Sequence, residues 1–187
     1  MTPPVSSRSR EHFLQEHAHH ELRVLLLIQA MVEPPGGPGH VDFPDPLTTL
    51  DFLVRHPLLT TRVLDQMSPN DPRLHLEEAD ARSADSPMLR HRYGLGLELD
   101  HTVVGALLGR GLLIRSTDDP VRTTLWPSIQ GTQVVRSAAN TSAWSTVFDR
   151  CRAVAEATRG HSHDHIAGLI RKRLSLDQGH DFGDLIT

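Results

Sequence analysis

The stretch that decides the fold is Pro87–Trp126, PMLRHRYGLGLELDHTVVGALLGRGLLIRSTDDPVRTTLW. Its middle part, Glu98–Arg110, carries apolar residues at helical spacing, and Gly111 follows as the kind of residue that ends a helix in a left-handed conformation. The sequence therefore predicts a helix over Glu98–Arg110. The apolar positions are Leu99, Val103, Val104, Leu107 and Leu108.

A β-hairpin is predicted directly after this helix. Leu112–Ile114 is a short apolar strand, Ser116–Pro120 has the composition of a turn, and Val121–Leu125 returns as the second strand. A helix that runs straight into a hairpin is the usual layout of a winged helix, with the helix in the recognition position and the hairpin as the wing. The sequence thus predicts a mainly α-helical, winged-helix-like domain with a small β-hairpin wing and flanking helices.

The rest of the chain is predicted to supply those flanking helices. The expected domain covers residues 11–160, after a Pro/Ser/Arg-rich segment at 1–10 that is expected to be disordered. The tail at 161–187 is expected to hold one short amphipathic helix. The helices predicted from apolar spacing are Glu11–Val32, Pro46 up to Pro57, Leu58–Met67, Ser128–Ala138, Ala143–Arg159 and, in the tail, Ile166–Leu174.

Composition narrows the class of protein. A chain of 187 residues is sufficient for one domain, and its net charge of −4 argues against a protein that mainly coats nucleic acid. Cys151 is the single cysteine, which excludes an internal disulfide and indicates a reducing compartment. The N-terminus lacks the apolar run of a signal peptide, and the longest apolar run, Val24–Ile28, is too short to cross a membrane. We therefore expect a cytoplasmic protein.

Three segments carry a resemblance to a known family. Leu50–Pro57, LDFLVRHP, resembles an LDFLLxHP-type segment. Arg92–Gly94 leads into the helix that ends in RGLL, and Leu125–Gly131 looks like a degraded LTPxG helix start. Together these segments resemble the small middle component of ABC-three-component systems, the Lamassu-type anti-phage defence operons. The resemblance covers roughly residues 21–157.

The resemblance implies a helical, winged-helix-like subunit without catalysis or cofactor. Such a subunit is an adaptor that works with an SMC/Rad50-like ATPase, which senses foreign or aberrant DNA, and with an effector such as a nuclease. Any contact with DNA would come through the complex. The segments 1–20 and 161–187 lie outside the match, and nothing is transferred to them.

The runner-up is a winged-helix transcriptional regulator, dimeric and bound to duplex DNA. Direct base readout needs Arg, Lys, Asn or Gln on the recognition helix, but this helix carries Glu98 and Asp100 at its start. The possible nucleic-acid contacts are Arg110 at the end of the helix and Arg115 and Arg122 in the wing. The two acidic residues would repel phosphate, so a protein-binding winged helix is favoured over a DNA reader.

Partner contacts are expected on the wing and on the tail helix, because both should project from the core. The wing offers Arg115 and Arg122. The tail helix presents an apolar stripe that needs a surface to dock on, either the core of this chain or a partner. The predicted tail contacts are Ile166, Leu169, Ile170 and Leu174.

Two histidine clusters raise the third hypothesis, a metal-dependent enzyme. They are His17–His20 and His161–His165, and His17 and His20 would share a helix face. However, the chain has no HExxH and no CxxC motif, so solvated histidines are the favoured interpretation. Cys151 lies on an apolar helix face and is expected to be buried. The sequence therefore predicts no metal site, no cofactor site and no catalytic residue.

Overall fold

A computed structural model of the chain describes residues 7–33, 39–64, 66–74, 88–89, 101–116, 123–173 and 185–186. The described part is mainly helical and includes a small three-stranded antiparallel sheet. The helices are α1 (Ser7–Val32), α2 (Asp45–Arg55), α3 (Pro57–Leu64), the 3-10 turn η1 (Pro72–Leu74), α5 (His101–Gly109), α6 (Ile129–Ala139), α7 (Ser142–Ala157) and α8 (His163–Arg173). The strands are β1 (Val41–Phe43), β2 (Met88–Leu89), β3 (Leu113–Ser116), β4 (Thr123–Pro127) and β5 (Leu185–Ile186).

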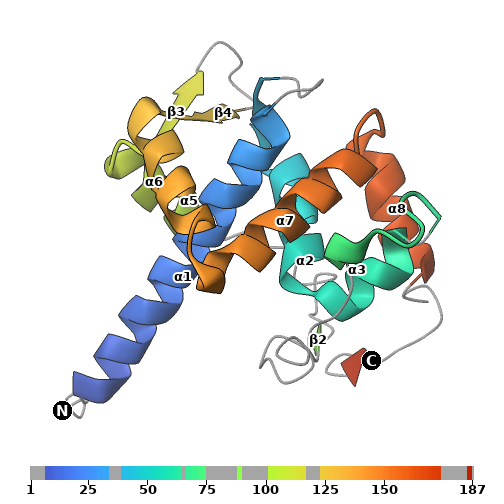
Figure 1. Cartoon of the computed structure of the whole chain (residues 1–187), viewed down its shortest axis with the longest axis horizontal. Coiled ribbons are helices and arrows are strands. Elements are labelled where there is room, and N and C mark those ends of the chain that lie inside the picture. The colour runs from blue at the N-terminus through green and yellow to red at the C-terminus, as the bar shows by residue number, and fades with distance from the viewer. Residues whose placement is uncertain are drawn as a thin grey trace.

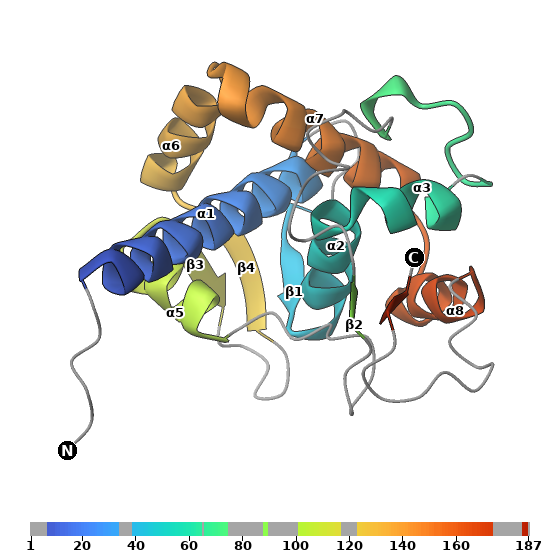
Figure 2. The same ribbon diagram turned by 90° about the horizontal axis from the view of Figure 1, so that it is seen from below.

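Helix α1 is the central element. Figure 2 shows α6 and α7 on one side of it, and the sheet and α5 on the other. The run Val24–Ile28 is buried at every position, because this part of the helix is apolar around its whole circumference. None of the described helices is long and apolar enough to cross a membrane.

The expected strand pair is present as β3 and β4, and it belongs to a larger sheet than predicted. The strand order is β1-β4-β3, with Val41 opposite Leu125 and Leu113 opposite Pro127. The sequence prediction missed β1, which has only three residues and follows a glycine- and proline-rich stretch. Because β4 is the central strand, Leu125 is fully buried between the sheet and α1.

The helix before the hairpin is confirmed over its described residues. Helix α5 ends at Gly109, and Gly111 has the positive φ of 69° expected of a left-handed cap. The amide of Leu112 donates to the carbonyl of Leu107, which closes the helix directly in front of β3. The expected start of this helix at Glu98 lies outside the described residues, as do most of the predicted turn and Arg122.

Two helix boundaries near the start of the chain bear on the predictions. Helix α1, at the N-terminal end of the chain (Figure 1), begins at Ser7, inside the segment 1–10 that was expected to be disordered, and residues 1–6 lie outside the described part. The helix predicted from Pro46 up to Pro57 does end there, because α2 stops at Arg55. Pro57 then opens α3, a position that proline tolerates because its missing N–H needs no partner there.

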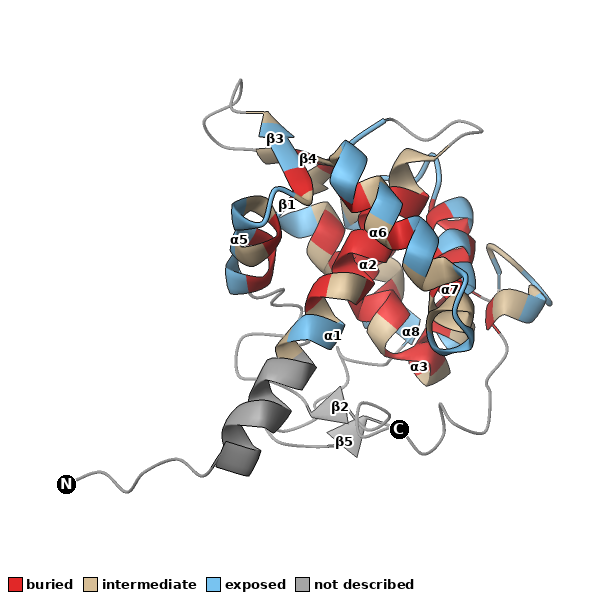
Figure 3. Cartoon of the chain, turned by 60° about the vertical axis from the view of Figure 1, so that its left-hand side comes forward, coloured by how far each residue is buried: buried red, intermediate tan, exposed pale blue. Residues whose placement is uncertain are grey.

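The prediction that the tail helix projects from the core is wrong. Helix α8 packs on α2 and α3 (Figure 3). Ile166 and Ile170 are buried in the same core as the residues of α1. The apolar stripe of this helix was predicted to contact a partner. It is covered within the chain instead, because α2 and α3 present apolar side chains to it. Leu169 is half-buried, and Leu174 lies outside the described residues.

One buried ion pair joins α1 to α2. The guanidinium of Arg23 donates to both carboxylate oxygens of Asp51, over 2.9 and 3.3 Å, and both side chains are almost fully buried. Arg55, one turn further along α2, lies 3.9 Å from the same carboxylate. The pair fixes how α2 lies on the central helix, because a buried charge is tolerated only next to its partner.

We expect Asp51→Asn to destabilise the protein by about 3–5 kcal/mol, because it leaves the positive charge of Arg23 buried without its counterion. The control is Glu33→Gln, which removes the more exposed Glu33–Arg152 pair and should cost at most about 1 kcal/mol. Urea denaturation followed by circular dichroism measures both values. Equal losses in the two variants would show that the Arg23–Asp51 pair has no special role.

A second prediction concerns the contact between α6 and the start of β3. A Cβ atom on Gly131 would overlap the backbone carbonyl oxygen of Leu112, so Gly131→Ala should cost about 1–3 kcal/mol. Gly105 on α5 has open space around it, and Gly105→Ala should stabilise the protein by about 0.5–1 kcal/mol. Thermal unfolding of the two variants should therefore shift in opposite directions. A neutral Gly131→Ala would contradict the close packing.

Candidate functional site

The β3–β4 hairpin and the start of α6 form one connected surface. Ser128 accepts a hydrogen bond from the amide of Gly131 at 2.9 Å and so caps α6. The same residue donates its hydroxyl to the carbonyl of Gly111 and its amide to the carbonyl of Leu112. These hydrogen bonds hold the first turn of α6 against the segment that leads from α5 into β3.

This surface exposes large apolar side chains. Among the residues whose side chains are described, Ile114 and Ile129 are the large hydrophobic residues that are exposed, by 43% and 84%. Ile114 lies opposite Trp126 in the sheet, on the face that points away from Leu113 and Leu125. Ile129 begins α6, three residues after Trp126. We call the surface formed by Ile114, Trp126 and Ile129 the wing surface. Arg115, which lies opposite Leu125, belongs to the other face of the strand pair.

The sequence analysis missed the two isoleucines of the wing surface, although a signal for each was present. Leu113 and Ile114 are neighbours in a strand, so only one of them can face the core. Ile129 is followed at i+3 and i+4 by Thr132 and Gln133, so it has no apolar neighbour on its helix face. Both positions were therefore recognisable as exposed apolar residues.

The predicted cationic contacts fall in different surroundings. Arg115 is exposed on β3 and forms no ion pair with another described residue. Arg110 is also exposed, but its guanidinium pairs with the carboxylate of Glu21 on α1, so part of its charge is neutralised within the chain. Arg122 lies outside the described residues. Of the three arginines, Arg115 is thus the exposed one that forms no ion pair among the described residues, and it follows Ile114 in β3 on the opposite face of the strand.

Helix α5 is poorly equipped to read DNA. Its exposed positions are His101, Thr102, Gly105 and Gly109, and the described helix contains no arginine, lysine, asparagine or glutamine. Such side chains are what base edges and phosphates require. Helix α5, which would be the recognition helix of a winged helix, therefore offers few side chains for direct contact with a DNA duplex.

An open groove lies between α1, α6 and α7, with a volume of about 490 Å³. Leu22, Val134 and Trp144 line its apolar floor, and the ring of His19 lies against Trp144 with the ring centres 4.5 Å apart. The rim is polar but uncharged. It consists of Gln130, Gln133, Ser137 and Thr141.

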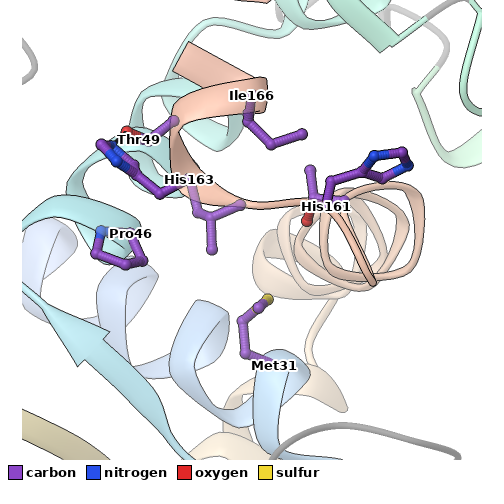
Figure 4. Close-up of a pocket in the computed structure, with 8 residues that line it drawn as sticks. Met31, Pro46, Thr49, His161, His163 and Ile166 are labelled. Atoms are coloured by element: carbon purple, nitrogen blue, oxygen red, sulfur yellow. Dashed lines mark hydrogen bonds between the residues drawn. The ribbon is translucent and has the colours of Figure 1, made fainter. Parts of the chain in front are cut away.

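A smaller pocket lies between α2, the end of α7 and the start of α8 (Figure 4). His163 points to Thr49, with 2.9 Å between the ring Nε2 and the hydroxyl, whereas His161 points the opposite way. The pocket volume of about 90 Å³ corresponds to a few water molecules, while ligand pockets span about 300–1,000 Å³. This pocket is therefore too small for a cofactor.

The histidines of the two clusters do not gather around a common centre. Among the described residues, no three His, Cys, Asp or Glu side chains are arranged to hold a metal ion. His161 and His165 are the closest pair of rings in the second cluster, with centres 4.9 Å apart and planes inclined by 16°. His163 faces Thr49 instead and stands apart from that pair.

Cys151 is fully buried on α7, as predicted. Burial raises the pKa of its thiol to about 12, and the nearby charges of Arg23, Asp51 and Arg150 only modify this effect. A nucleophilic cysteine needs an accessible thiolate, so Cys151 acts as a small apolar residue of the core.

In comparisons with known proteins, the chain matches no family model, no curated protein and no solved structure.

We expect Cys151 to resist thiol reagents at mildly alkaline pH while the protein is folded. A pKa raised from 9.0 to about 12 lowers the thiolate fraction about a thousandfold, and burial removes access as well. Titration with a chromogenic disulfide reagent should detect no fast thiol until denaturant is added. An added Ser142→Cys, at an exposed position of the same helix, should react at once and serves as the control. Fast reaction of native Cys151 would contradict its burial.

Proposed function

We propose that this protein is a non-catalytic adaptor subunit of a Lamassu-like anti-phage and anti-plasmid defence complex. In this role it binds an SMC/Rad50-like ATPase together with an effector subunit, for which a nuclease is the expected class. The family resemblance supplies the identity of the partners, and the wing surface supplies the physical support. An adaptor needs an exposed apolar patch, because apolar burial stabilises most protein–protein contacts.

The observation that carries the proposal is the position of Ile114 and Ile129. They are the exposed large hydrophobic residues of the described part, and both belong to the unit of wing and α6. Exposed aliphatic side chains fit the anatomy of an interface, with an apolar centre and a polar rim. Arg115 follows Ile114 on β3, an edge strand of its sheet, where it is exposed on the other face and forms no ion pair with another described residue.

Ile166 and Ile170 of the tail helix are not part of the proposed partner contact. Both side chains are buried under α2 and α3, so a partner could reach them only if α8 left the core. The proposed partner contacts are therefore Arg115, Ile114 and Ile129.

A winged-helix arrangement is part of this proposal. The order of a helix, a strand, further helices and a two-stranded hairpin supports it, as does the place of β1 beside β4. A dimeric regulator that reads DNA is the second candidate, and the exposed Arg115 is the observation in its favour. The uncharged face of α5 weighs against it, because direct readout depends on that helix.

The test is co-purification. The chain is expressed with the products of neighbouring genes, captured through a tag, and washed at moderate salt. We expect an SMC-like ATPase in fixed ratio, and we expect Ile114→Glu or Ile129→Glu to weaken its binding about tenfold or more, because charge at an apolar hot spot is costly. Ala143→Glu places the same charge at an exposed position of α7 and should leave binding unchanged.

Two outcomes would contradict the proposal. A chain that elutes alone as a dimer and retains duplex DNA would leave the regulator standing. Recovery of the ATPase in equal amount with all three variants would place the contact somewhere other than the wing surface.

A further inference from the structure

We propose that His161 and His165 form a binding site for a divalent transition-metal ion of the zinc, nickel or copper class, at the junction of α7 and α8. The proposal is independent of the adaptor function, because it rests on a different part of the molecule. It gives a metal-binding role to the second histidine cluster, whose side chains were predicted from the sequence to be solvated only.

The first support is the placement of the two rings. Their centres lie 4.9 Å apart and their planes differ by 16°, so the rings face each other almost in parallel. Two nitrogens that share a tetrahedral ion at about 2.0–2.1 Å lie roughly 3.3 Å from each other. In the stacked arrangement the ring planes are nearly parallel, so both side chains must turn about their own bonds before a nitrogen of each can point at a shared ion. Both side chains are exposed to solvent, which leaves room for that turn.

The second support is the backbone that carries the rings. Helix α7 ends at Ala157 with Thr158 as its C-cap, and Gly160 follows with a positive φ of 77°. The amide of His161 donates to the carbonyl of Thr158 over 3.2 Å. Ser162 accepts from the amide of His165 through its hydroxyl and from the amide of Ile166 through its carbonyl. Both histidines are thus attached to a hydrogen-bonded turn, which lowers the entropy lost when an ion is bound.

The third support is that the turn is fixed on one side and open on the other. Ile166 and Ile170 hold α8 in the core, while the side chains of His161 and His165 are exposed to solvent. An ion could therefore enter without opening the fold. Asp164 and Arg159 are exposed near the pair and carry opposite charges.

The chemistry of the donors selects the class of ion. Two imidazoles favour zinc, nickel and copper over calcium or magnesium, which prefer oxygen ligands. His163 is not a third ligand, because its ring is bonded to Thr49 on the opposite side of the turn (Figure 4). Water molecules would fill the remaining coordination positions of the ion. The bound ion would therefore stay open to solvent and would not be enclosed by protein ligands. A bound ion would link His161 before α8 to its first turn and favour the folded state.

The experiment follows the protein by nuclear magnetic resonance while Cu²⁺ is added. A paramagnetic ion broadens the signals of nearby amides, so it reports where the ion binds and separates this pair from His17, His19 and His20. We expect the amides around residues 158–168 to broaden first. His161→Ala and His165→Ala should each weaken binding at this site about tenfold or more, since each removes one of two ligands. Zinc titration by calorimetry should show the same order.

The matched control is His40→Ala, which removes another exposed histidine and should leave the broadening unchanged. The spectra of the metal-free variants check that α8 stays folded. Broadening confined to other histidines would overturn the proposal, and so would broadening at this turn that persists in His165→Ala.

Discussion

The rest of the structure depends on the need to cover α1 on every side. Val24–Ile28 is apolar around the whole helix, and leaving even one of these side chains in water would cost about 1.5–3 kcal/mol. Helices α6 and α7 cover one side, and α5, the sheet and α2 cover the others. The buried Arg23–Asp51 pair then fixes one of these neighbours in place, because apolar packing alone has little directional preference.

This arrangement explains why one face of the β3–β4 hairpin leaves apolar side chains exposed. Once β4 has placed Leu125 against α1, the side chains on the opposite face of the sheet are less covered, with Ile114 exposed and Trp126 half-buried. Trp126 and Ile114 belong to that face, and Ser128 brings Ile129 to the same end of the hairpin. The exposed apolar patch is thus a consequence of covering the central helix, and it is the surface on which the proposed adaptor function rests.

The tail shows where local sequence patterns mislead. The spacing of Ile166, Leu169 and Ile170 correctly indicated an amphipathic helix, but periodicity does not say what covers the apolar stripe. In the folded chain α2 and α3 cover it, from more than a hundred residues earlier in the sequence. The short strand β1 was missed for a related reason, since three residues acquire strand structure only by pairing with β4.

The sequence by itself determined the helices α5, α6 and α7, the glycine that ends the helix before the hairpin, and the burial of Cys151, because these depend on local spacing and on backbone conformation. Only the tertiary structure decided the third strand, the docking of α8, the exposure of Ile114 and Ile129, and the stacking of His161 on His165. Each of these depends on contacts between segments that are far apart in the sequence. Which apolar surfaces become buried against each other is therefore decided by the whole fold and not by any one segment.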